Sequence, residues 1–111
     1  MNNIFESNLL ENLGPHEFRR SIQRLLLQIG WDCFSIDGPG DGGGDLYAEN
    51  KNGERWIIQS KWRKNKPIQP SVIDEALSAF SLYDANAAII VTNQFLTYPA
   101  EQKLKNLQAS G

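Results

Sequence analysis

Apolar and polar residues follow two periods along the chain, and the change of period marks out the elements. In the segment after Gly14 apolar side chains recur every three or four residues, which predicts a helix with one stripe facing a core. The members of this stripe are Phe18, Ile22, Leu25, Leu26 and Ile29. Pro15 suits the first turn of such a helix, and Gly30 ends it.

The next three apolar segments, 31–37, 45–49 and 54–62, are short enough to predict strands joined as a meander. Asn52-Gly53 indicates a hairpin between the second and the third of these segments. A three-residue loop at 51–53, with Gly53 in the left-handed conformation, pairs Asn50 with Glu54 and therefore Asp45 with Gln59. Because such loops carry a bulge, we expect this register to hold within about one residue.

The second half of the chain predicts a helix, a buried strand and a last helix. Ser71 and Asp74 form a Ser-x-x-Asp capping pattern that opens a helix over 71–83. The apolar run 87–92 is typical of a strand buried on both faces, and a helix follows over 97–109. The passage from the third strand to the fourth predicts a right-handed parallel crossover. The fold class is therefore α/β, with a mixed sheet flanked by helices.

Length and composition indicate one ordinary globular domain. The chain has 111 residues, of which 41% are hydrophobic and 22% charged. Its single cysteine, Cys33, has no partner for an internal disulfide and is expected to be a small buried hydrophobe in a reducing, cytoplasmic setting. No secretory signal and no run of about 20 apolar residues is present, so no membrane partner is expected. The end at Gly111, just past the last helix, suits a domain cut from a longer multidomain protein as well as a natural end, and we favour the former.

Charge is arranged locally rather than over the whole chain. The net charge of -2 and the pI near 5.3 exclude a protein that coats nucleic acid through bulk charge. Five basic residues and no acid nevertheless occur between residues 55 and 66, which leaves room for a local contact with a polyanion. They are Arg55, Lys61, Arg63, Lys64 and Lys66.

The stretch PGDGGGDL at 39–46 carries the first sign of chemistry. It is not a phosphate-binding P-loop, because no Gly-Lys-Ser/Thr opens a helix after it, and an EF-hand started at Asp37 would need ligands at Pro39 and Ala48. The lone His16 finds no second histidine to form a transition-metal site.

Four polar side chains are expected to meet near this loop. In the predicted register Asp45 lies beside Gln59, Lys61 shares their face, and Glu17 approaches from the edge of the first helix's buried stripe. Carboxylate and amide oxygens suit Mg²⁺, and a lysine can orient a water or offset charge on a phosphate oxygen. Each residue alone has an ordinary explanation: Asp45 in a turn, Gln59 and Lys61 on a polar strand face, Glu17 in a first helical turn. Only their joint arrangement favours a site.

Three short motifs carry a resemblance to a known family. His16-Glu17-Phe18, the glycine-rich GDGGGDL at 40–46 and Gln59-Ser60-Lys61 resemble the Mrr-like branch of the PD-(D/E)xK nuclease superfamily, in its Q-x-K variant. The likeness extends over residues 14–105. It implies the restriction-endonuclease-like fold, with element order α-β-β-β-α-β-α, and Mg²⁺-dependent hydrolysis of DNA phosphodiester bonds in restriction, DNA defence or repair.

The same resemblance implies roles for individual residues. Asp45 and Gln59 are expected as metal ligands, the carbonyl of Ser60 as a further ligand and Glu17 as the acid carried by the helix. Lys61 is expected as the catalytic lysine, and Mn²⁺ as a substitute for Mg²⁺. The serine between Gln59 and Lys61 varies a position that is often small or apolar, and leaves the backbone ligand intact.

The expected partner is DNA, held through its phosphates by Arg63, Lys64 and Lys66. Family members usually carry a linked recognition or helicase/ATPase domain, and nothing in these residues resembles one, so target choice is not encoded here. A homodimer is left open. Two alternatives remain: a catalytically silent DNA-binding or interaction module of the same fold, and a loop that binds a small phosphate metabolite.

Overall fold

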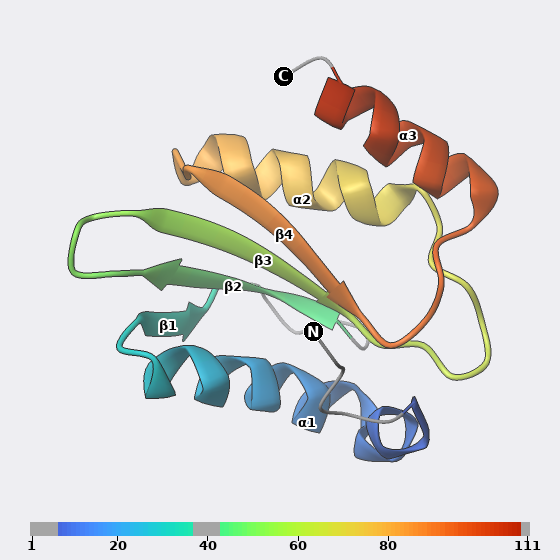
Figure 1. The fold of residues 1–111 in the computed structure, drawn as a ribbon, viewed down its shortest axis with the longest axis horizontal. Helices are drawn as coiled ribbons and strands as arrows, with labels where there is room; N and C mark the ends of the chain where they lie inside the picture. Colours follow the sequence, from blue (N-terminus) through green and yellow to red (C-terminus); the bar gives the residue numbers. More distant parts are fainter. Residues whose placement is uncertain (1–6, 37–42, 110–111) are drawn as a thin grey trace.

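A four-stranded sheet lies between one helix on one side and two helices on the other (Figure 1). The computed structural model describes residues 7–36 and 43–109, with side chains described for 14–36 and 46–109. The elements are α1 (Ser7–Gln28), β1 (Asp32–Ser35), β2 (Gly43–Glu49), β3 (Arg55–Lys61), α2 (Ser71–Leu82), β4 (Ala87–Thr92) and α3 (Tyr98–Ala109). The predicted order of elements and the α/β class are confirmed.

The strands lie in the order β1-β2-β3-β4, with β1, β2 and β3 antiparallel and β4 parallel to β3. At the β2–β3 hairpin the Asn50 N–H donates to the Glu54 carbonyl at 3.0 Å, and the Gly53 N–H donates to the Asn50 carbonyl at 3.1 Å. Gly53 has φ of 82°, which the three-residue loop requires. The backbone of Asp45 consequently pairs with that of Gln59, as the turn chemistry predicts.

Helix α1 has two parts joined at Gly14, where φ of 77° and ψ of 167° break the helical geometry. The predicted start at Pro15 is therefore the start of the second part, and the first part begins at Ser7. At the other end the Trp31 N–H donates to the Leu26 carbonyl at 3.0 Å, and the Gly30 N–H to the Leu27 carbonyl at 3.1 Å. This Schellman motif, with Gly30 at φ of 92°, ends the helix as expected.

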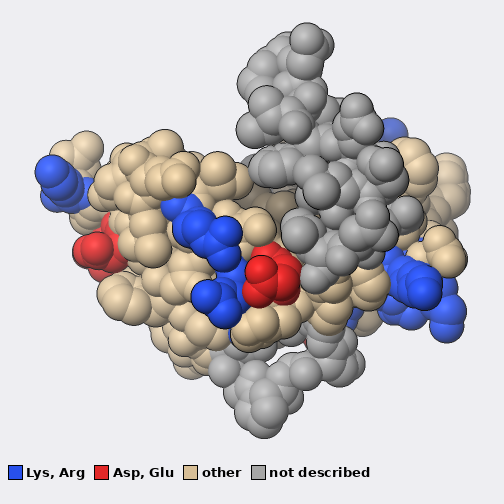
Figure 2. All heavy atoms as spheres, turned by 90° about the horizontal axis from the view of Figure 1, so that it is seen from below, with Lys and Arg blue, Asp and Glu red and all other residues tan. Residues whose placement is uncertain are grey.

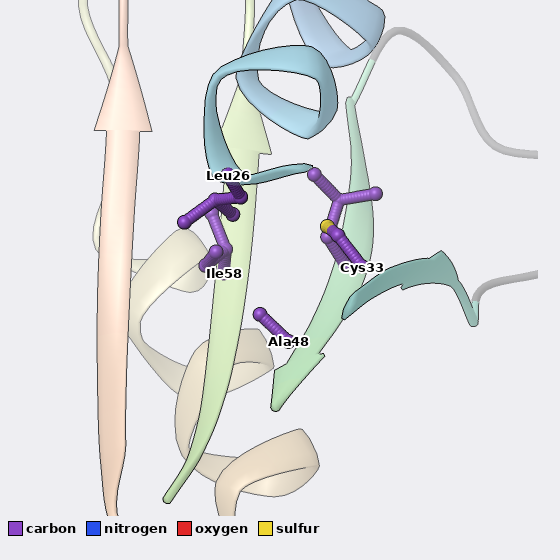
Figure 3. Packing of buried hydrophobic residues seen from close by; sticks show 5 residues of the cluster. Leu26, Cys33, Ala48 and Ile58 are labelled. Carbon is purple, nitrogen blue, oxygen red and sulfur yellow. The ribbon is translucent and has the colours of Figure 1, made fainter. Parts of the chain in front are cut away.

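The core on the α1 side of the sheet is apolar. Leu26 of α1 lies beside Ile58, and Cys33 and Ala48 come from the neighbouring strands (Figure 3). Trp31 and Trp56 extend this cluster, with ring centroids 4.2 Å apart.

Two members of the predicted stripe do not belong to this core. Phe18 and Leu26 are buried, but Leu25 is 43% exposed and Ile29 is 68% exposed. Ile29 lies in the turn that ends the helix. The sheet also stops at β1, a strand of only four residues, and so offers these two side chains little to pack against. The stripe is correct at its centre and wrong at its C-terminal end.

On the other side, α2 and α3 pack around Ile68, Val72, Ile73 and Ala100. Helix α3 is capped by Thr97, whose hydroxyl oxygen accepts from the Ala100 N–H at 3.2 Å. The predicted capping pattern of α2 is wrong. The N-cap position is occupied by Pro70, one residue before Ser71, and Pro70 has helical backbone angles. No described side chain caps the start of this helix.

Strand lengths differ from expectation in two places. β1 covers Asp32–Ser35 rather than 31–37, and β2 begins at Gly43, two residues before the predicted start. Gly43 and Gly44 join the strand because they pair with Lys61 and Ser60, so two of the loop's glycines are ladder residues. None of the helices in the described part of the chain is long and apolar enough to cross a membrane.

Candidate functional site

Gln59 is a buried polar residue at the centre of the sheet. Its side chain is 5% exposed, and its amide oxygen Oε1 finds no hydrogen-bond donor among the described residues. The amide nitrogen Nε2 lies 3.5 Å from Oε1 of Glu75 on α2, which places the Gln59 side chain on the α2 side of the sheet. A buried acceptor without a partner costs about 1–3 kcal/mol, so natural folds seldom keep one without use.

The pairing of β2 with β3 brings the backbones of Asp45 and Lys61 close to Gln59. The backbone of Asp45 lies directly opposite Gln59, and that of Gly43 opposite Lys61. Alternation along the strand puts Lys61 on the face of Gln59. Lys61 is half-buried, and within the described residues its ammonium forms no hydrogen bond or ion pair. The side chain of Asp45, like Asp41 and the rest of 37–42, lies outside the described residues.

Glu17 lies in the opposite layer. It belongs to α1, its side chain is 49% exposed, and its carboxylate is 4.0 Å from Arg20 one turn later. The N-terminal half of α1 nevertheless lies at the end of the sheet where β3 finishes and β2 begins (Figure 1). The structure thus brings Gln59 and the Asp45 backbone into register, and puts Glu17 on the helix that runs past this end.

Among the described side chains, no three histidine, cysteine, aspartate or glutamate groups gather as a metal site. The donor set expected here is different, because it includes an amide oxygen, a backbone carbonyl and Asp45. Oε1 of Gln59, which has no donor among the described residues, fits a hard cation, since Mg²⁺ takes neutral oxygen donors beside one or two carboxylates. Ser60, whose carbonyl is the further expected donor, is 1% exposed.

The basic run divides into two parts in space. Arg55 begins β3 and binds the Asp84 carbonyl through Nε and Nη2, at 3.0 and 2.8 Å. Arg63, Lys64 and Lys66 follow the other end of β3, and the two lysines are exposed. Figure 2 views the molecule from the α1 side and shows one group of Lys and Arg side chains at the end where the loop after β3 lies in Figure 1, besides others near the middle and at the opposite end of this face.

The loop after β3 is held by side chains from the end of β4. The Arg63 N–H donates to Asn93 Oδ1 at 2.9 Å, and Asn93 Nδ2 donates back to the Arg63 carbonyl at 2.9 Å. Gln94 Nε2 donates to the same carbonyl at 3.0 Å. The side-chain amide of Asn93 thus continues the hydrogen bonding between β3 and β4 beyond the last backbone pair, Lys61 with Thr92. This arrangement ties the basic loop to the end of the parallel pair.

Glu75 and Asn93 are contacts that sequence reasoning missed. In the sequence Glu75 is one polar residue of an amphipathic helix beside Asp74, and nothing in the pattern distinguishes the two. The structure separates them, because Asp74 binds Lys103 of α3 whereas Glu75 turns to Gln59. Asn93 directly follows an apolar strand, where a polar residue is a signal for a site, but its partner lies 30 residues earlier in the chain.

Among the described residues, the pKa values of Cys33 and Tyr47 are raised. Burial raises the pKa of the Cys33 thiol to about 11, so this thiol stays protonated and unreactive at neutral pH. Desolvation, helped by the hydrogen bond to Glu49, raises the pKa of Tyr47. His16 is exposed, which agrees with a surface histidine.

Comparison with known proteins identifies the class to which this fold and site belong. A family model described as restriction endonuclease, Mrr_cat, matches residues 10–109, nearly the whole chain. The protein therefore belongs to the Mrr-type restriction endonuclease family, as the three motifs indicate. No curated protein matches the chain.

A solved structure of EndoMS in apo form is similar to this fold. The TM-score is 0.53 and the sequence identity 14%, with 96% of this chain and 44% of the EndoMS chain covered. At that identity the likeness concerns the fold alone, and this chain spans less than half the length of EndoMS. The fold is restriction-endonuclease-like, an α/β arrangement with a mixed sheet.

Proposed function

We propose that the chain is a Mg²⁺-dependent endonuclease domain that hydrolyses DNA phosphodiester bonds, acting in restriction, DNA defence or repair in the cytoplasm. The observation that carries this proposal is the buried amide oxygen of Gln59, which has no donor among the described residues. The backbone of Gln59 pairs with Asp45, two residues before Lys61. Membership of the restriction endonuclease family supports a nuclease reaction.

The contact with Glu75 supports an oriented Gln59 side chain. A carboxylate can only accept a hydrogen bond, so it favours the amide rotamer that turns Nε2 toward Glu75. Oε1 then points away from Glu75. The contact is long, at 3.5 Å.

In this proposal Asp45, Gln59 and the Ser60 carbonyl hold the metal, and Glu17 completes the set from α1, past the end of the sheet where β3 finishes (Figure 1). Bound Mg²⁺ supplies Lewis-acid stabilisation for charge that develops on the phosphate. Lys61 orients the attacking water and offsets negative charge on a phosphate oxygen, since its ammonium lies on the Gln59 face without a carboxylate partner among the described side chains.

Two ligand carboxylates and a neutral amide balance the charge of one Mg²⁺ ion better than that of two. Titration calorimetry without DNA is expected to show one tight site, and two tight sites would contradict this charge balance.

Arg63, Lys64 and Lys66 position the DNA backbone without reading its sequence. The hydrogen bonds from Asn93 and Gln94 support this role, because a loop with a fixed backbone loses less entropy when it binds.

Reversing the charges of Lys64 and Lys66 is expected to weaken DNA binding and to reduce its salt dependence. An unchanged salt slope would remove these lysines from the interface. Target choice is then the work of a linked recognition or motor domain.

The decisive experiment is cleavage of supercoiled, linear and branched DNA with Mg²⁺, Mn²⁺ or EDTA. Wild-type protein is expected to cleave with either metal and not with EDTA, and Asp45→Ala is expected to be inactive. Asp32→Ala is the matched control, because Asp32 is an exposed aspartate whose backbone pairs with Glu49, near the other end of β2. Cleavage that survives in Asp45→Ala would overturn the assigned site. DNA binding without cleavage under every condition would favour the silent DNA-binding module.

A further inference from the structure

Two aromatic side chains close to the basic loop are exposed beyond what the core explains. Phe95 is 86% exposed and Tyr98 is 73% exposed, on the segment that joins β4 to α3. The nearby Leu96 is packed against the α2–α3 core, so the segment has an inward side chain of its own. Phe95 and Tyr98 therefore contribute little to folding, although each exposes a large apolar surface.

This aromatic segment is joined directly to the basic loop. The Ile68 N–H donates to the Phe95 carbonyl at 2.9 Å, and the Thr97 N–H donates to the Ile68 carbonyl at 2.9 Å. Gln94, next to Phe95, donates to the Arg63 carbonyl at 3.0 Å. The two segments thus run side by side at the end of the sheet that carries the candidate site (Figure 1). The basic loop and the aromatic segment are therefore neighbours at this end of the sheet.

We infer that Phe95 and Tyr98 stack on unpaired bases, and that the preferred substrate is DNA with unpaired nucleotides beside the cleaved strand. The inference rests on the proposed function, since it assumes that Arg63, Lys64 and Lys66 hold the phosphates. Positive charge with exposed aromatic rings is the combination by which proteins bind single-stranded nucleic acid. In paired duplex the base faces are hidden in the stack, so the rings gain a contact only where bases are unstacked.

The charges favour DNA over a protein partner as the occupant. Lys64 and Lys66 are exposed, and neither forms an ion pair in the described part of the chain. An apolar protein surface would bury these ammonium groups without compensation, whereas a DNA strand offers phosphates to the lysines and base faces to the rings. The hydrogen-bonded backbone holds the rings in place before binding, which lowers the entropy cost of ordering them.

The test compares three fluorescent DNAs of equal length in EDTA, where no cleavage is expected: a single strand, a duplex and a duplex with a central unpaired bubble. The Phe95→Ala/Tyr98→Ala variant is expected to bind the single strand and the bubble about 10-fold or more weakly, as loss of one to two stacked bases implies. Its affinity for the duplex is expected to change less than about twofold. Phe34→Ala is the matched control, because Phe34 is 55% exposed on the distant edge strand β1.

A second readout reports stacking itself. A 2-aminopurine in the bubble is expected to change its fluorescence when wild-type protein binds, and to change much less with the double variant. Equal weakening on all three DNAs, or no weakening, would overturn the inference and leave the proposed nuclease function standing. Wild-type protein that binds none of the three DNAs would overturn both.

Discussion

The two faces of β3 are equally buried but differ in what they bury. Ile58 faces α1 and is 2% exposed, within a cluster in which every neighbour is apolar. Gln59, the next residue, faces α2 and is 5% exposed, with an oxygen that no described donor satisfies. Burial at Ile58 serves stability alone. Burial at Gln59 lowers stability, and this difference is why Gln59 is proposed as a ligand.

The same contrast extends along the strand. On the α1 face the chain alternates through Trp56 and Ile58, which pack on the helix, and the face stays apolar. On the α2 face Ile57 is fully buried, but the following positions are Gln59 and the half-buried Lys61. The apolar face contributes to folding throughout, whereas the other face changes from core to candidate site within one strand.

The largest effect on cleavage is expected from Lys61→Ala, on the α2 face of β3. Cleavage should fall by about 100-fold or more, because a positioned acid-base or charge-stabilising group contributes that much. Thermal unfolding and metal affinity should stay close to wild type, since Lys61 is only half-buried. Lys51→Ala, at the exposed hairpin, is the control and should keep full activity. Retained cleavage in Lys61→Ala would remove this residue from the mechanism.

Ile58→Ala tests the apolar face. The unfolding free energy should drop by about 2–5 kcal/mol, because the substitution leaves a cavity among closely packed side chains. Urea denaturation measures the loss, and Ile29→Ala, at a position 68% exposed, should cost far less. Equal losses in the two variants would mean that this face is not the core described here.

Gln59→Leu is expected to change stability in the opposite direction. An apolar side chain of similar size removes the unsatisfied oxygen, so the unfolding free energy should stay level or rise by about 1 kcal/mol. Any rise in Tm on adding Mg²⁺ should disappear at the same time. Gln28→Leu is the exposed control and should keep the Mg²⁺ response. A loss of stability as large as that of Ile58→Ala would show that Gln59 is an ordinary core residue.

The last prediction involves no substitution and concerns Cys33 on the apolar face. Its pKa is raised from 9.0 to about 11 in the fold, so at pH 8 the thiolate fraction is about 100-fold below that of the unfolded chain. Iodoacetamide should therefore modify native protein at least that much more slowly than protein in urea. Because the folded pKa is the higher one, this stabilising contribution is complete below pH 9 and is lost as the pH rises toward 11. Fast labelling of native protein would contradict the burial of Cys33.

Much of the framework could be predicted because it depends on neighbouring residues. Gly53 and the length of the 51–53 loop determine the hairpin, and the two-residue period of strands then carries the register to Asp45 and Gln59. Gly30 ends α1 by a motif that lies within six residues. Prediction failed where burial depends on residues far away in the sequence. Leu25 and Ile29 fit a helical stripe, but the short strand β1 leaves them exposed.

By itself, then, the sequence determined the order of elements, the β2–β3 register and the motif residues of the family. These follow from backbone sterics, side-chain period and turn chemistry, which act over a few residues. Only the tertiary structure decided that Gln59 is buried with its Nε2 at Glu75 and its Oε1 without a donor among the described residues. Only the tertiary structure, likewise, decided that Asn93 joins the basic loop to the aromatic segment. Such contacts join residues 16 and 30 positions apart, and they form when a helix packs on a sheet or a strand adds to its edge.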